Sequence, residues 1–176
     1  MPEEKFEAML SGGHPNSLGR TVEVVERVLS NKTRLAELFD CYDSQDAVVR
    51  LRTSNALKRI CRAQPESLVS YLDHLLERIS QIDQASAQWT LATLFLLLAP
   101  WMNPRQRKKA RQIMQRNLEH HQDWIVLNTT MDTLAQWAEQ DSDLRSWLLP
   151  QLQKLQHDKR RSVARKAVNI STRLSE

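Results

Sequence analysis

All three glycines of the chain, Gly12, Gly13 and Gly19, lie within its first 19 residues. Everything after Gly19 must therefore fold without the residue that most easily adopts positive φ. Phosphate-binding loops, tight β-hairpins and nucleophile elbows use glycine for that reason. The sequence consequently excludes most enzyme fingerprints.

Length and composition indicate an ordinary globular protein. The 176 residues, 41% of them hydrophobic, are enough to bury the core of one domain, which excludes a disordered tail or a disulfide miniprotein. Cys41 and Cys61 lack metal-ligand spacing and predict reduced thiols in a cytoplasmic protein. The N-terminus does not resemble a signal peptide, and the longest apolar run, Leu94 to Trp101, is far shorter than the roughly 20 residues of a membrane span. We expect no membrane association, metal or cofactor.

Apolar residues recur at helical spacing almost throughout, and Pro, Asn, Asp and Ser provide the stops. We predict no strand, a loose segment over residues 1–16, and helices over 17–29, 31–42, 46–63, 65–80, 85–99, 103–119, 123–139, 142–156 and 159–175. Pro150 predicts either a kink in the eighth helix or a later start for it. The fold class is all-α.

Helices of similar length joined by short loops suggest an internal repeat. Placing Val49, Ala87, Val126 and Val163 in register gives spacings of 38, 39 and 37 residues, and each residue lies in the second helix of a predicted pair. A period near 38 built of two antiparallel helices predicts a helical solenoid.

The first repeat carries the clearest motif. Acids at Asp43 and Asp46 precede a Val-Arg pair and then small and apolar residues, namely Val49, Arg50, Thr53, Ser54, Ala56, Leu57 and Ile60. This pattern resembles the second helix of a HEAT repeat. The other three repeats keep the apolar frame, with Gln88 in place of the arginine in one and Arg165 displaced by one position in another. Asp46 and Arg50 are expected to have structural roles.

The resemblance covers residues 31–176 and implies a right-handed α-solenoid of about four HEAT-like helix pairs, preceded by an N-terminal segment and capping helix over residues 1–30. It also implies a non-catalytic binding or scaffold protein that meets a protein partner through the concave surface of its second helices. The candidates on that surface are Arg52, Arg59, Trp89, Asn128, Asp132 and Arg165. The charged final helix can cap the solenoid, which favours a monomer.

Charge distribution supports an alternative, a nucleic-acid-binding module. Up to Asp46 there are five basic and nine acidic residues, and no acid lies between Asp83 and Glu119. Two basic runs, 105–116 and 159–166, would position a phosphate backbone. Their candidate contacts are Arg105, Arg107, Lys108, Arg111, Lys159, Arg160, Arg161 and Arg165.

A third hypothesis is an alkylpurine DNA glycosylase, because a HEAT-like family of such enzymes uses tryptophans and an aspartate in its cleft. The corresponding residues would be Trp89, Trp124, Asp132 and Trp137, although core packing explains tryptophans at such positions equally well. His120 and His121 are adjacent and would point about 100° apart on a helix, so they predict no metal site.

Overall fold

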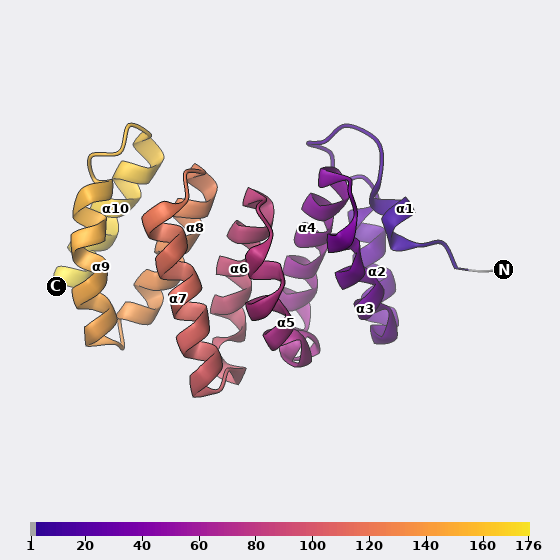
Figure 1. The fold of residues 1–176 in the computed structure, drawn as a ribbon, viewed down its shortest axis with the longest axis horizontal. Coiled ribbons are helices and arrows are strands. Elements are labelled where there is room, and N and C mark those ends of the chain that lie inside the picture. Colours follow the sequence, from indigo (N-terminus) through magenta and orange to yellow (C-terminus); the bar gives the residue numbers. More distant parts are fainter. Residues whose placement is uncertain (1–2) are drawn as a thin grey trace. The chain divides into compact units, whose positions relative to one another are not determined.

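The computed structural model describes residues 3–176 of the chain, which contain ten α-helices, five short 3₁₀ helices and no strand (Figure 1). The prediction of an all-α fold is confirmed. The chain divides into two compact units, unit 1 up to Ile82 and unit 2 over Asp83–Glu176. Of the N-terminal segment predicted over 1–30, residues 1 and 2 lie outside the described part. No helix among the described residues combines the length and the apolar character that a bilayer span needs.

Unit 1 is organised around its longest helix, α4 (Ala47–Ala63). This helix packs against α1 (Phe6–Leu10), α2 (Thr21–Ser30) and α3 (Leu35–Asp40), and it also contacts the 3₁₀ turns around it. The predicted helix over 31–42 is α3 flanked by 3₁₀ turns over 32–34 and 41–43. The predicted helix over 65–80 is α5 (Leu72–Glu77) with 3₁₀ segments over 65–71 and 79–81.

One expectation for the N-terminal part of unit 1 was wrong. Residues 1–16 were expected to be loose, but Phe6–Leu10 form the short helix α1, whose Phe6, Met9 and Leu10 are buried. Their spacing of three and four residues is helical, so the signal is present in the sequence.

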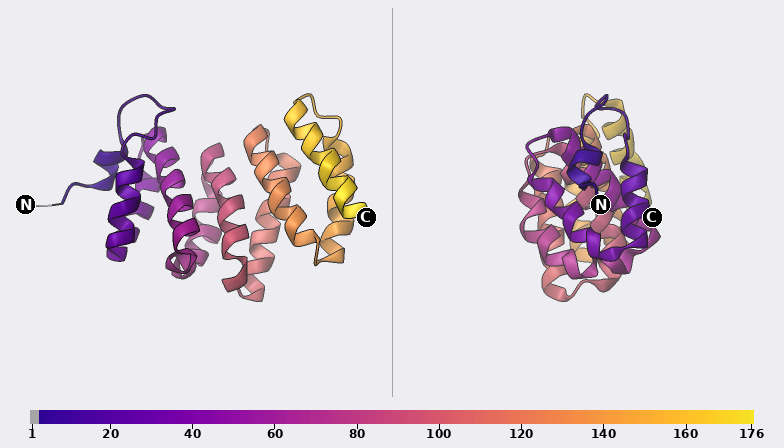
Figure 2. Two further views of the ribbon diagram at one scale, coloured as in Figure 1. Left: turned by 180° about the vertical axis from the view of Figure 1, so that it is seen from behind. Right: turned by 90° about the vertical axis from the view of Figure 1, so that its right-hand side faces the viewer.

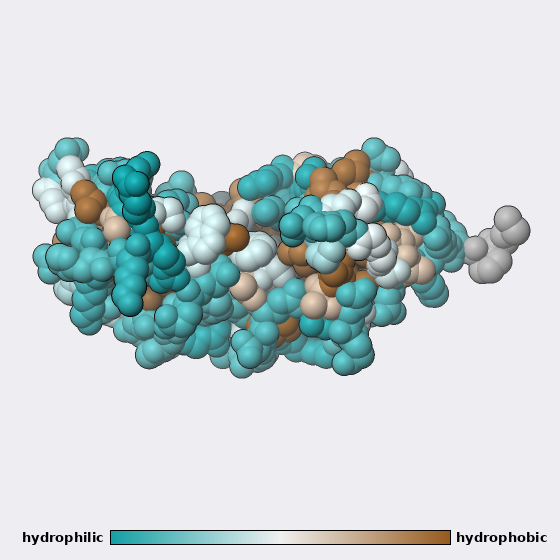
Figure 3. Space-filling view, turned by 90° about the horizontal axis from the view of Figure 1, so that it is seen from above, coloured by the Kyte–Doolittle hydropathy of each residue, from teal (hydrophilic) through white to brown (hydrophobic). Residues whose placement is uncertain are grey.

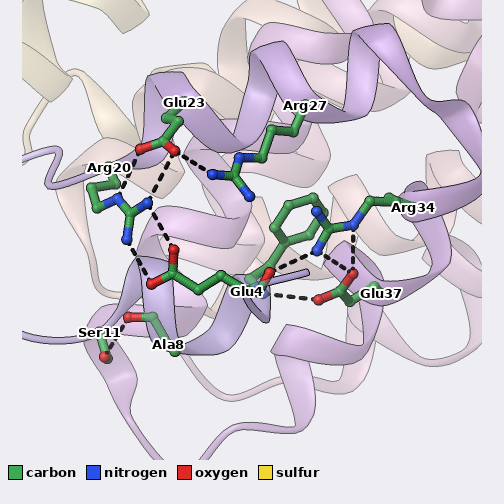
Figure 4. A network of polar contacts seen from close by, with 9 residues as sticks. Glu4, Ala8, Ser11, Arg20, Glu23, Arg27, Arg34 and Glu37 are labelled. Carbon is green, nitrogen blue, oxygen red and sulfur yellow. Dashed lines mark hydrogen bonds and ion pairs between the residues drawn. The ribbon is translucent and has the colours of Figure 1, made fainter. Parts of the chain in front are cut away.

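Ion pairs hold this N-terminal part on unit 1 (Figure 4). The Arg20 guanidinium binds Glu4 and Glu23, both at 2.8 Å, and Arg27 reaches Glu23 from the next turn of α2 at 2.7 Å. Arg34 lies 3.8 Å from the centroid of the Phe6 ring and binds Glu37 at 2.7 Å. These contacts connect α1 to both α2 and α3.

Arg52 of α4 lies inside unit 1 and is 2% exposed. Its guanidinium donates hydrogen bonds to the backbone carbonyls of Leu10 and Gly12, both at 2.7 Å, of Ser17 at 3.0 Å and of His14 at 3.1 Å. A buried charge requires such partners, because an unpaired one is costly to desolvate. The segment between α1 and α2 is therefore folded around Arg52.

Unit 2 is organised around α8 (Trp124–Ala138), which packs against each of the other four helices of the unit. Helix α8 lies between α6 (Ala85–Leu98) and α10 (Arg161–Ser175) in one layer. These three helices are in front in the left view of Figure 2. Helices α7 (Pro104–His120) and α9 (Ser142–Leu155) cover the other side, in front in Figure 1. Unit 2 thus has two layers, with α6, α8 and α10 in one and α7 and α9 in the other.

Polar side chains connect the helices of unit 2. The Thr133 hydroxyl of α8 donates to the Ala92 carbonyl of α6 at 2.7 Å, in the buried interior. The Asn117 amide of α7 donates to the Gln88 side chain of α6 at 2.9 Å, also buried. Both bonds supply partners to polar groups that have lost contact with water, as burial requires.

The four residues used to define the repeat have matching positions in the structure. Val49, Ala87, Val126 and Val163 are each the third residue of their helix, and each is at most 1% exposed. The positions four residues later, Thr53, Leu91, Thr130 and Ala167, are also buried in all four helices. The same buried frame therefore begins at the same place in α4, α6, α8 and α10.

Side-chain caps explain where several of these helices begin. Asp46 accepts from the Val48 N–H at the start of α4, and Asp123 accepts from the Ile125 and Val126 N–H groups at the start of α8. The Arg50 side chain donates to the Ser44 carbonyl just before α4. Helix α9 begins at Ser142 and continues through Pro150, so a later start is excluded.

Candidate functional site

Unit 2 contains an open pocket of about 660 Å³. It lies where α6 and α8 end and α7 and α9 begin, so its wall comes from four helix ends and from the 3₁₀ turn η5 (Ala99–Trp101). The lining residues are Leu96, Ala99, Pro100, Met102, Arg107, Lys108, Arg111, Gln136, Trp137, Gln140, Asp141 and Leu144. The volume is within the range of about 300–1,000 Å³ that is typical of ligand pockets.

The lining has an apolar floor and a polar rim. Met102 and Leu144 are buried, Leu96 and Trp137 are half-buried, and together they provide aliphatic and aromatic surface. Trp101, in the same 3₁₀ turn as Pro100, is 43% exposed. A concave apolar surface with a few polar groups around it is the usual composition of a binding site.

The rim is basic. Arg107 and Lys108 are exposed on the first turns of α7, and Arg111 follows one turn later. The Arg107 guanidinium donates to the Met102 carbonyl at 3.0 Å, which holds its stem at the pocket edge. Lys108 makes no ion pair or hydrogen bond within residues 3–176. Its ammonium group is therefore available to a ligand.

Asp141 is the one acid in the pocket wall, and it is fully engaged. One carboxylate oxygen accepts from the Arg111 guanidinium at 2.9 Å, and the other caps α9 by accepting from the Leu144 N–H at 2.9 Å. The remaining rim charges, on Arg107 and Lys108, are not neutralised by it. The pocket therefore has a positive field near an apolar floor.

Local sequence explains why α7 presents its arginines at this place. Asn103 and Gln106 form a capping box, in which each side chain accepts from the backbone N–H of the other residue, and Pro104 occupies the first helical position. This start fixes the phase of α7. Ala110, Ile113 and Met114 then face the interior, while Arg107, Lys108 and Arg111 line the pocket.

The structure places the start of the first basic run far from the second run. Helices α7 and α9 each run opposite to the helix that follows, so Arg105, Arg107 and Lys108 lie at the lower end of unit 2 in Figure 1, and the 156–160 segment lies at the upper end. Figure 3 views that upper end, and the part belonging to unit 2, on the left, is mainly hydrophilic. Helix α7 alone spans about 25 Å. The start of the first run and the whole second run therefore lie at opposite ends of unit 2.

Residues of the second run differ in how they are engaged. Lys159, Arg161 and Arg165 are exposed. Arg160 is half-buried, binds Asp158 at 2.8 Å and donates to the Gln122 carbonyl. The bond from Arg160 lowers the pKa of Asp158 to about 2. Arg160 therefore has a structural role at the start of α10.

The predicted candidates on the second helices do not form a common exposed site. The expectation that Arg52 is exposed was wrong, because it is buried and bound to four carbonyls. Asn128 is 9% exposed and donates to Ser162 at 3.4 Å. Asp132 is exposed and pairs with Lys166 of α10 at 2.5 Å. Arg59 is exposed and donates to Asn55, whereas Trp89 is half-buried.

The residues considered for a glycosylase are also dispersed. Of the four, only Trp137 lines the pocket, and Trp124 is 49% exposed elsewhere on α8. Within residues 3–176 no group of three or more His, Cys, Asp or Glu side chains could hold a metal ion. Burial raises the pKa of both Cys41 and Cys61 to about 12, so neither thiol is an activated nucleophile.

Sequence reasoning found the basic rim but missed the floor. Leu96, Met102, Trp137 and Leu144 come from four separate segments, and each fits a helical core pattern by itself. The one available signal was the acid-free stretch from Asp83 to Glu119, which contains the whole α7 side of the pocket. No protein-family model, curated protein or solved structure matches the chain.

Proposed function

We propose that the protein is a non-catalytic binding protein built from HEAT-like helix pairs, and that it binds a partner protein at the pocket of unit 2. The observation that carries the proposal is this open apolar pocket with a basic rim. Partner proteins bury an apolar anchor in such a pocket and surround it with polar contacts.

The HEAT-like interpretation, a right-handed α-solenoid of about four pairs, is supported by the shared buried frame of α4, α6, α8 and α10. It is also supported by the sequence Asp46, Val49, Arg50 at the start of α4, where Asp46 acts as the N-cap. A fold of stacked helix pairs provides binding surfaces at helix ends and loops without any catalytic group.

Nucleic-acid binding remains the second candidate, favoured by the exposed Lys159, Arg161 and Arg165 at the other end of unit 2. Phosphate contacts alone require no apolar pocket, because they are electrostatic. The pocket therefore favours a protein partner.

Photo-crosslinking tests the choice. A photoreactive residue would replace Gln140, which is exposed at the pocket rim, and in a control would replace Gln45, which is exposed in unit 1. In an extract of the cells that produce the protein, we expect crosslinked species from position 140 only, removed by protease and unchanged by nucleases. Species removed by nucleases would instead identify nucleic acid as the partner. Equal yields from both positions would overturn the assignment to the pocket.

A further inference from the structure

From the charges around the pocket, and resting on the proposed function, we infer its ligand class: an acidic segment of a partner protein that inserts an apolar side chain between its carboxylates. The apolar group would occupy the floor at Leu96, Met102 and Trp137, and the carboxylates would meet the basic rim.

Charge complementarity is the first support. Three cationic side chains, Arg107, Lys108 and Arg111, line the pocket, and Asp141 is the one acid among its lining residues. The starts of α7 and α9 and the ends of α6 and α8 meet at this rim, so the helix dipoles offset one another and the positive field comes from the side chains. A carboxylate is attracted to this rim, whereas a lysine-rich segment is repelled.

Asp141 shows how a carboxylate is held here. Its Oδ2 lies 2.9 Å from Arg111 Nη1, and Asp141 also occupies part of the rim that a ligand would use. Since Asp141 is the protein's own competitor for Arg111, its removal frees a guanidinium that can bind a ligand carboxylate in two-pronged geometry.

The apolar floor distinguishes the ligand from other anions. A nucleic acid needs several phosphate contacts, and the second basic run lies at the opposite end of unit 2. A free small molecule is normally enclosed over most of its surface. Here Pro100, Gln136 and Gln140 are exposed along the edge, so the pocket is open enough to accept a side chain presented by a larger partner.

Fluorescence anisotropy with the purified full chain tests the inference. The probe is a short labelled peptide of glutamates around a central Leu-Phe pair. Two comparison peptides replace the central pair by alanines or the glutamates by lysines. We expect binding of the first peptide only, weakening as salt is raised. Comparable affinity for the alanine peptide would show that the apolar floor is not used and would overturn the inference.

Single substitutions locate the site. Lys108→Glu is expected to weaken binding about fivefold, through the change of an exposed rim charge. Lys159→Glu makes the same charge change at an exposed lysine of the opposite end and is expected to leave the affinity unchanged. Equal weakening by both variants would mean attraction to net charge alone, which would overturn the pocket as the site.

For Asp141→Asn we expect the opposite effect on peptide affinity. Asparagine keeps the cap on the Leu144 N–H and removes the charge that pairs with Arg111, so peptide affinity should rise about threefold. An unchanged thermal unfolding profile confirms that α9 is still capped. A loss of affinity in a folded Asp141→Asn protein would contradict the proposed competition.

The crosslinking experiment and the peptide-binding experiment distinguish failure of the proposed function from failure of the ligand class. Protein crosslinks from position 140 without binding of the acidic peptide would keep protein binding and refute this ligand class. Tighter binding of a DNA oligonucleotide than of the peptide, weakened by Lys108→Glu, would assign the basic rim to nucleic acid and refute both.

Discussion

Arg52 occupies a fully buried position of α4, three residues after Val49 and four before Ala56. Burial of a guanidinium is tolerated here because the segment between α1 and α2 presents four carbonyls to it. The carbonyls of Leu10, Gly12, His14 and Ser17 thus accept hydrogen bonds from a residue 35 to 42 positions away. Arg52 therefore supplies the hydrogen-bond donors that backbone N–H groups supply to carbonyls in regular secondary structure.

Replacing Arg52 by Met should lower the free energy of unfolding by about 3 kcal/mol, because several charge-assisted hydrogen bonds are lost together. Urea unfolding followed by far-UV circular dichroism measures this. Arg59→Met is the matched control in the same helix, since Arg59 is exposed and donates only to Asn55, and it should change stability by less than about 0.5 kcal/mol. Equal effects would contradict the structural role of Arg52.

Alanine substitutions at Gly12 and Gly19 distinguish the cost of backbone strain from the cost of a steric clash. Both have positive φ, +53° and +73°. A Cβ on Gly12 would meet nothing within 4 Å, whereas one on Gly19 would lie 2.9 Å from Arg52 Nη1. Gly12→Ala should cost about 1 kcal/mol through φ alone, and Gly19→Ala at least about 1 kcal/mol more. The same urea titration compares them, and equal costs would show that Arg52 yields to the added methyl group.

The role of Arg52 illustrates what sequence alone cannot predict. Its spacing from Val49 and Ala56 is that of one helix face, but an arginine is normally expected on the outside, and the sequence predicted Arg52 on a binding surface. Its acceptors are backbone atoms, which leave no pattern in the side chains. The glycines at 12, 13 and 19 are the only sequence signal of that segment, and by themselves they predict only a turn.

Among the elements, the starts of the capped helices were the most predictable feature. Asp46, Asn103, Asp123 and Asp141 are all observed caps, and a capping side chain leaves a local signature. The five-residue helix α1 was missed although its apolar spacing was helical, because so short a segment is stable only through its contacts with α2, α3 and α4. The pocket floor was missed because four helix ends assemble it.

Helix α9 contains Pro150, which is exposed and lacks the N–H that would bond the Ser146 carbonyl. Pro150→Ala should restore this bond and raise the free energy of unfolding by about 1 kcal/mol. Pro104→Ala is the control, because Pro104 stands at the first position of α7, where no N–H bond is lost, and no gain is expected. Calorimetry measures the melting temperatures of both variants. A lower melting temperature for Pro150→Ala would show that the proline ring contributes to packing.

At the scale of the whole molecule, the two units differ in charge. Unit 1 has 11 basic and 12 acidic residues, whereas unit 2 has 14 basic and nine acidic residues. Several acids of unit 1 form ion pairs with arginines. Bonds from Arg20 and then Arg27 lower the pKa of Glu23 to about 2, and the bond from Arg20 lowers that of Glu4. Burial alone would raise the pKa of Glu37, but bonds from the Phe6 N–H and Arg34 outweigh it and lower the value.

These shifts predict acid sensitivity of unit 1. A carboxylate whose pKa is lower in the folded than in the unfolded state adds stability above about pH 4.5, and this contribution is lost as the pH falls toward 2. The free energy of unfolding should therefore fall over that range, and Glu23→Gln should make the fall shallower. Urea unfolding at a series of pH values measures this. Glu26→Gln, at an exposed glutamate of the same helix, should keep the full slope.

The position of the pocket at the ends of four helices has a consequence for how such a protein can diversify. The contact of α8 with α6 lies in the buried interior, where the Thr133 hydroxyl donates to the Ala92 carbonyl, whereas the rim includes exposed side chains such as Lys108 and Gln140. Under the proposed function, such exposed rim residues can change the ligand preference while the interior stays the same, whereas Asp141 of the rim also caps α9 and so contributes to stability. On that proposal, ligand preference and folding stability depend on largely different residues of unit 2, so a change of partner would require no repacking of the interior.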